Sequence, residues 1–170
     1  MSDDPRATLR DGAFMQRAYD LAEAAIHNGD HPFGALLVHD GRMIASAVNR
    51  VETATDVTRH AELELVRDVW ANFDETIRGG SVLYTSTEPC LMCAGAIHWA
   101  GIRRVVFGVA ARAMAEAIGR PYRGLPLRDV VRATGYEIDV IGPVMQEDGL
   151  RIHREFWPRP EIDSDPEPAL

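Results

Sequence analysis

Residues 87–93 read Thr-Glu-Pro-Cys-Leu-Met-Cys. Proline is favoured in the first turn of a helix, so Pro89 predicts that a helix starts here and continues over 91–99. Cys90 and Cys93 are three residues apart, which places both sulfurs on one face of that helix. The partly positive N-terminus of a helix favours thiolate, the form that binds zinc. A Cys-x-x-Cys pair alone leaves metal binding, redox chemistry and chance open.

A second motif, His60-Ala61-Glu62, lies about 30 residues upstream. It falls near the start of a helix expected over 59–70, which Thr58 can cap. One imidazole and two thiolates make three protein ligands and leave the fourth tetrahedral position open for water, as in catalytic rather than structural zinc sites. A carboxylate beside this position can take a proton from the water and return it to a substrate.

Hydrophobic periodicity and turn signals predict an α-β-β-α-β-α-β-α-β-α order, hence a mixed sheet between helices. A loose leader is expected over 1–10 and a polar loop over 52–58. The expected helices cover residues 11–26, 59–70, 91–99, 110–118 and 126–133, and a last helix or an extended tail is expected over 146–156. The expected strands cover residues 34–39, 43–48, 81–86, 104–109 and 137–141.

The length of 170 residues fits one domain, expected over 1–158, with a disordered acidic tail over 159–170. The net charge of −8 disfavours nucleic acid as the main partner, because phosphate binding needs a basic surface. No apolar run approaches the roughly 18 residues that cross a bilayer, and no apolar secretion signal is present at the N-terminus. These features predict a cytoplasmic protein without a membrane segment.

The two motifs together resemble the cytidine deaminase superfamily, whose zinc deaminases carry an H-x-E…P-C-x-x-C signature. The resemblance covers about residues 14–157. It implies an α/β fold with three α/β/α layers and a five-stranded mixed sheet. It also implies one zinc ion per chain, held by His60, Cys90 and Cys93, with Glu62 as the catalytic proton shuttle.

Two branches of this superfamily are similar to the chain: guanine deaminases and bacterial tRNA adenosine deaminases. His31-Pro32-Phe33-Gly34 resembles the Pro-Phe-Gly of guanine deaminases, and residues 95–99 resemble their Gly-Ala-Ile-Tyr-Trp. The resemblance implies that Phe33 and Trp99 line an aromatic base pocket. Asn49 matches an asparagine that contacts the substrate in both branches.

Other positions separate the branches. Residues 109–114 lack the Lys-Thr-Gly-Ala run of the RNA branch, and residues 120–122 lack the acid of the guanine deaminases. The aromatic C-terminal segment is similar to those that lie over the site of free-base deaminases, which implies substrate contacts for Phe156 and Trp157. Ala61, between the two motif residues that act, completes the expected substrate-binding set.

The sequence therefore predicts zinc-dependent hydrolytic deamination of a free nucleobase or related amino-heterocycle, by a homodimer. The candidate substrates are guanine, a cytosine analogue or an aminotriazine. One alternative is a tRNA adenosine-to-inosine deaminase. Another is a non-enzymatic zinc or redox module, in which Glu62 would be dispensable. Contributions of Glu116, Tyr122 and His153 to specificity stay open.

Overall fold

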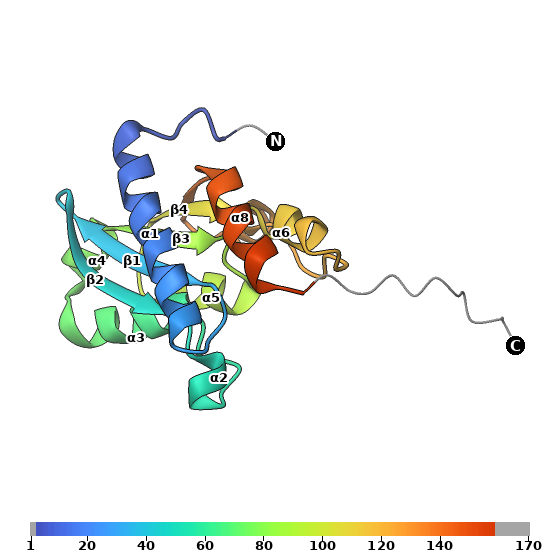
Figure 1. Ribbon diagram of the computed structural model, residues 1–170. Helices are drawn as coiled ribbons and strands as arrows, with labels where there is room; N and C mark the ends of the chain where they lie inside the picture. The colour runs from blue at the N-terminus through green and yellow to red at the C-terminus, as the bar shows by residue number, and fades with distance from the viewer. Residues whose placement is uncertain (1–2, 159–170) are drawn as a thin grey trace, which may run out of the picture.

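The computed structural model describes residues 3–158 and contains a five-stranded sheet in the order β2-β1-β3-β4-β5 (Figure 1). Strand β1 pairs antiparallel with β2 and β3, whereas β3, β4 and β5 run parallel. The predicted five-stranded mixed sheet is confirmed. The strands are β1 (Gly34–His39), β2 (Arg42–Val48), β3 (Val82–Thr87), β4 (Arg104–Val109) and β5 (Asp139–Ile141).

Helices cover both faces of the sheet, as the three-layer prediction requires. Helices α1, α6 and α8 pack on one face and α3, α5 and α7 on the other, and α1 and α8 lie side by side in Figure 1. The helices are α1 (Leu9–His27), α2 (Val51–Ala54), α3 (Ala61–Asn72), α4 (Glu75–Gly79), α5 (Leu91–Trp99), α6 (Ala111–Ala117), α7 (Leu127–Thr134) and α8 (Gln146–Phe156).

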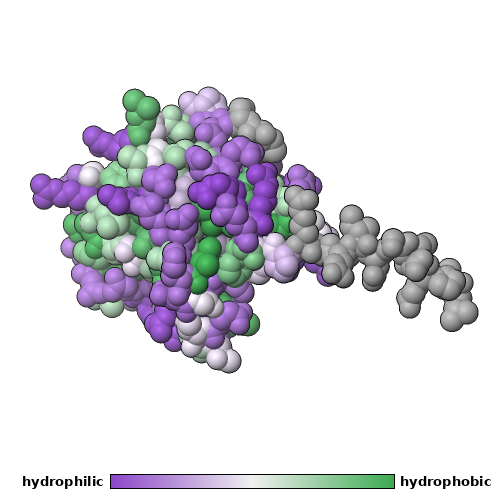
Figure 2. Space-filling model, in the orientation of Figure 1, coloured by the Kyte–Doolittle hydropathy of each residue, from purple (hydrophilic) through white to green (hydrophobic). Residues whose placement is uncertain are grey.

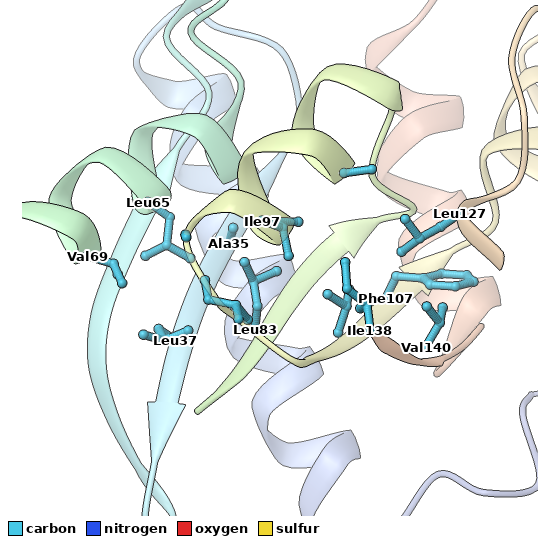
Figure 3. Close-up of a cluster of buried hydrophobic side chains, with 14 of the residues drawn as sticks. Ala35, Leu37, Leu65, Val69, Leu83, Ile97, Phe107, Leu127, Ile138 and Val140 are labelled. Carbon is cyan, nitrogen blue, oxygen red and sulfur yellow. The ribbon is translucent and has the colours of Figure 1, made fainter. Parts of the chain in front are cut away.

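Strand β1 shows how the chain builds two cores. Side chains alternate between the faces of a strand. Ala35 and Leu37 pack with Leu65 of α3 in one cluster (Figure 3), whereas Leu36 and Val38 join the cluster beneath α1 and α8. A strand buried on both faces has a nearly continuous apolar sequence, which β1 has.

Helix α3 begins two residues later than predicted, and the difference matters for the site. Thr58 does not cap it, because the Thr58 hydroxyl donates to Asp56 Oδ1 at 2.7 Å. His60 is the N-cap residue, with extended backbone angles of φ −67° and ψ 149°. The imidazole therefore belongs to the N-cap residue, just before the first turn of the helix.

Two short helices, α2 and α4, and the start of α1 were not predicted. Asp30 caps α2 from a distant part of the chain: its Oδ1 accepts from the backbone N–H groups of Glu52 and Thr53 at 2.9 and 3.0 Å. Helix α1 begins at Leu9 because Thr8 and Asp11 form a capping box. The remaining predicted elements differ from the observed ones by at most two residues at an end.

The described surface mixes polar and apolar residues, and the face drawn in Figure 2 is largely hydrophilic. Within residues 3–158, no helix is both long enough and apolar enough to cross a membrane. The predicted acidic tail, 159–170, lies outside the described residues.

Candidate active site

The two sequence motifs meet at the N-termini of neighbouring helices. His60 is the N-cap of α3, Cys90 is the N-cap of α5, and Cys93 lies in the first turn of α5. Helices α3 and α5 pack against each other, and α5 starts just after β3 ends at Thr87. The site thus lies at the carboxyl edge of the parallel strands, where open α/β sheets bind their ligands.

The three donor atoms have the separations that a tetrahedral zinc ion requires. His60 Nδ1 lies 3.7 Å from Cys90 Sγ and 3.6 Å from Cys93 Sγ, and the two sulfurs are 3.6 Å apart. Zn–S and Zn–N bonds of about 2.3 and 2.0–2.1 Å at the tetrahedral angle give S···S about 3.8 Å and S···N about 3.6 Å. His60, Cys90 and Cys93 are therefore positioned to bind a metal ion.

The two cysteines hold their protons with different strength. Hydrogen bonds with the Cys93 thiol, His60 and the Cys93 backbone N–H together lower the pKa of Cys90 to about 4. The hydrogen bond with Cys90 and burial raise the pKa of the Cys93 thiol. Both cysteines bind zinc as thiolates, so zinc binding would release the proton of the weaker acid, Cys93.

Glu62 is buried beside this ligand set, with 6% of its surface exposed. Its Oε1 accepts from the Thr85 hydroxyl at 3.1 Å, and its Oε2 lies 3.6 Å from Cys93 Sγ. Burial raises the pKa of the Glu62 carboxyl above its ordinary value. A carboxyl group with a raised pKa next to a metal site is suited to exchange protons near neutral pH.

The site opens into a cavity of about 600 Å³. His60, Glu62 and Cys90 line it, together with the start of α5 and the irregular segment 118–125 that follows α6. This volume lies within the roughly 300–1,000 Å³ of small-molecule sites. The cavity can enclose a heterocycle the size of a nucleobase.

Two of the predicted aromatic residues line this cavity: Phe33 and Trp157. The Phe156 ring lies perpendicular to that of Trp157, with the ring centres 4.7 Å apart, and Phe156 itself does not line the cavity. Tyr122, whose role the sequence left open, also lines the cavity, whereas Glu116 is exposed and does not.

The structure does not place Trp99 in this cavity. Trp99 is the last residue of α5, about 13 Å along the helix from Cys90 at 1.5 Å per residue. It is 77% exposed and shares a separate shallow hollow with Trp70. Trp99 therefore does not line this cavity, and its contact with a substrate stays a prediction.

Ala61 and Asn49 also lie outside the cavity lining. Ala61 is fully buried in the core beneath α3, so its methyl group packs inward. Asn49 is buried at the end of β2, where its Oδ1 accepts from the Val51 backbone N–H at 3.0 Å. Its own backbone N–H donates to the carbonyl of Phe33 at 2.9 Å, which keeps it next to the cavity wall.

Sequence reasoning gave no role to Glu88, which the structure places between the metal site and the opposite cavity wall. Glu88 Oε2 accepts from the backbone N–H of Ala111 at 3.0 Å, and Oε1 accepts from that of Leu127 at 2.7 Å. These are the first residues of α6 and α7. One carboxylate, two residues before Cys90, thus holds both ends of the segment 111–127, which contains α6 and the 118–125 wall. The only feature of the local sequence that points to Glu88 is that this acidic residue directly precedes Pro89-Cys90.

We expect Glu88→Gln to raise KM about tenfold, with a smaller effect on kcat and zinc content. Glutamine can accept from one of the two N–H groups but turns an amide toward the other, so the cavity wall loses its position. Loss of one charge-assisted hydrogen bond, about 1.5–3 kcal/mol, corresponds to at least about a tenfold change. Asp74→Asn is the matched control: Asp74 caps α4, away from the cavity. An unchanged KM in Glu88→Gln would contradict this role.

His153 is buried where α8 meets the site. Its Nε2 lies 2.9 Å from the Thr87 hydroxyl, and its ring centre is 5.4 Å from that of Phe33. Burial lowers the pKa of His153 from 6.5 to about 4. The imidazole is therefore neutral in the folded protein near pH 7 and acts in packing and hydrogen bonding.

This shift predicts a stability loss between pH 6.5 and pH 4. The unfolded chain takes up a proton on His153 near pH 6.5, but the folded protein does so only near pH 4. The contribution of His153 to the free energy of unfolding is therefore fully present above pH 6.5. It falls by about 3 kcal/mol as the pH drops to 4. Urea unfolding of wild type and His153→Gln at both pH values measures the difference. Equal losses in the two proteins would disprove the assignment.

Comparisons with known proteins agree with this geometry. A family model, the cytidine and deoxycytidylate deaminase zinc-binding region, matches residues 9–109, which include both motifs. A probable cytosine deaminase from Schizosaccharomyces pombe is 36% identical over 153 residues, 87% of this chain and 93% of that protein. A tRNA-specific adenosine deaminase from Agrobacterium fabrum is 42% identical over 95 residues, 56% of this chain and 62% of that protein.

Solved structures include a guanine deaminase from Nitrosomonas europaea, with a TM-score of 0.71 and 27% identity over 91% of this chain and 87% of that one. The family match, the fold and the three metal-binding side chains agree, and the chain therefore belongs to the zinc-binding cytidine and deoxycytidylate deaminase family.

Proposed function

We propose that this protein catalyses zinc-dependent hydrolytic deamination of a free nucleobase or a related amino-heterocycle, with release of ammonia. The candidates are guanine, a cytosine analogue and an aminotriazine. One observation carries the proposal: a buried carboxylate, Glu62, lies beside three metal-binding side chains that open into a small-molecule cavity.

The proposed mechanism assigns the proton transfers to Glu62. Zinc held by His60, Cys90 and Cys93 would lower the pKa of water and so supply a nucleophile near neutral pH. The Glu62 carboxylate takes the proton of the attacking water, delivers it to the ring nitrogen and then assists departure of the amine. Its raised pKa makes both directions of transfer accessible, and the Thr85 hydroxyl holds the carboxyl group in place.

The substrate ring would be held by aromatic side chains. Phe33 and Trp157 line the cavity, and we propose that the heterocycle packs against them. We also propose that the Asn49 amide reads the ring edge. Its Oδ1 is already bonded to Val51, so its N–H groups remain to donate to a ring acceptor. The homodimer and the cytoplasmic location stay predictions.

The alternative is tRNA adenosine deamination, and the similarity to the A. fabrum enzyme favours it. The net charge of −8 weighs against it, because binding of a nucleic acid depends on neutralising several phosphates. The S. pombe relative, a probable cytosine deaminase similar over 87% of this chain, supports a small substrate, although a tRNA-specific adenosine deaminase is similar over 85% of the chain.

Ammonia release separates these functions. Zinc-loaded protein is offered a panel of free bases and aminotriazines and, separately, a tRNA anticodon stem-loop, with Glu62→Gln protein as the blank for each arm. We expect the wild-type protein to release ammonia from at least one small heterocycle. The Glu62→Gln variant should release none from it. Release from the stem-loop with none from any small heterocycle would overturn it.

A further inference from the structure

Two arginines, Arg120 and Arg123, line the cavity from its irregular wall. Within residues 3–158, no carboxylate oxygen lies within the 4.0 Å ion-pair distance of either guanidinium group. This is notable in a chain with 26 acidic residues against 18 basic ones. Both arginines are exposed at this wall, and among the described residues neither has a protein anion beside it.

Aromatic stacking holds one of these arginines at the cavity edge. The Arg120 guanidinium carbon lies 5.0 Å from the centre of the Trp157 ring, which also lines the cavity. A third arginine, Arg112, stacks 5.1 Å from the centre of the Tyr122 ring, another part of the same wall. Cation–π contacts orient a guanidinium plane and leave its N–H donors free along the edge.

The carboxylates that line the cavity do not neutralise this charge. Glu88 uses both oxygens on backbone N–H groups, and Glu62 is buried against Thr85 and Cys93. A cleft lined by unpaired charge of one sign concentrates ligands of the opposite sign. The cavity therefore favours a negatively charged ligand, although the chain as a whole has a net charge of −8.

We infer that the substrate carries an anionic substituent, a carboxylate or a phosphate, that Arg120 and Arg123 bind. This inference rests on the proposed function and replaces the neutral free base by an anionic amino-heterocycle, either a carboxylated base or a nucleoside monophosphate. The planar guanidinium fork of arginine matches both oxyanions with two parallel hydrogen bonds. The ring would pack against Phe33 and Trp157, with its anionic group on the side of the 118–125 wall.

An RNA backbone offers the same phosphate chemistry, but the structure favours a small anion. RNA binding requires a run of several phosphate contacts. Here the unpaired cations are gathered on one wall of a cavity of about 600 Å³, in a chain with a net charge of −8. RNA binding is therefore an outcome of the test and not the proposal.

Each ring is tested both as the neutral base and as an anionic derivative. Cytosine is compared with 5-carboxycytosine and cytidine 5′-monophosphate, and guanine with guanosine 5′-monophosphate, by kcat/KM for ammonia release. The wild type is expected to prefer one anionic form over its neutral base at least about tenfold, as one charge-assisted contact gives. The preferred form shows whether the anion is a carboxylate or a phosphate.

Variants of the two arginines test whether this preference for the anionic form depends on the cavity wall. Arg120→Gln/Arg123→Gln is expected to reduce the anionic-to-neutral ratio to about one, mainly through KM. Arg132→Gln is the matched control, because Arg132 is exposed on α7, pairs with Asp129 and does not line the cavity. It should keep the wild-type ratio.

Failures of the two proposals can be told apart. A wild type that deaminates neutral and anionic forms equally, or a double variant with an unchanged ratio, overturns the inference while deamination stands. No release from any small heterocycle overturns the proposed function and the inference together. Release only from an anticodon stem-loop, lost in the double variant, overturns both and assigns the arginines to RNA.

Discussion

Replacing Glu62 with glutamine is expected to lower turnover at least about 10⁴-fold while zinc content and fold stay unchanged. Glutamine keeps the size of the side chain and can still accept from the Thr85 hydroxyl. It cannot carry a proton between water, ring nitrogen and leaving amine. General acid–base groups contribute about 10²–10⁴-fold, and a group that serves several transfers should reach the upper end.

Glu64→Gln is the matched control for this experiment. Glu64 is a second buried glutamate on α3, but it pairs with Arg59 and Arg67, each at 2.8 Å, and does not line the cavity. Its replacement should lower thermal stability and leave turnover near the wild-type value. Ammonia release, zinc content and thermal unfolding are measured on all three proteins. A Glu62→Gln variant that retains a tenth of wild-type turnover would show that Glu62 is not the shuttle.

The second large effect is expected for Cys93→Ser, which should lose tightly bound zinc and several kcal/mol of stability. The metal joins the N-termini of α3 and α5, so its binding free energy adds to the free energy of unfolding. Serine nearly preserves the volume of this fully buried side chain. The change therefore tests the ligand and not the packing.

A chelator provides the control for Cys93→Ser. With zinc removed, wild type and variant should unfold at similar denaturant concentrations, because the remaining difference is one sulfur atom. With zinc present, only the wild type should gain stability. If chelation leaves the wild type as stable as before, or if the variant gains equally from zinc, Cys93 does not act as a ligand.

The residues of the candidate metal site could be identified from two short motifs and their resemblance to a known family. Cys90 and Cys93 share a helix face by their spacing. Their contact with His60, 30 residues before Cys90, depends on the packing of α3 against α5, and the role of Glu62 stays a prediction. Strand β1 was predictable from local sequence alone, since its apolar run ends at the Asp40-Gly41 turn.

Features that depend on distant contacts could not be predicted. Asp30 caps α2 across more than twenty residues of chain, and Glu88 binds backbone groups of two later helices. The position of Trp99 follows from the length of α5 and not from the motif that contains it. The 118–125 wall has no regular hydrophobic period, so its place beside the metal site depends on tertiary packing.

Zinc content and ammonia release are measured on the same samples of protein purified without chelator. We expect about one zinc ion per chain. Removal of this zinc should abolish deamination of the substrate found in the screen, and one equivalent of zinc should restore it. Full turnover by protein shown to contain no zinc would contradict zinc-dependent catalysis at this site.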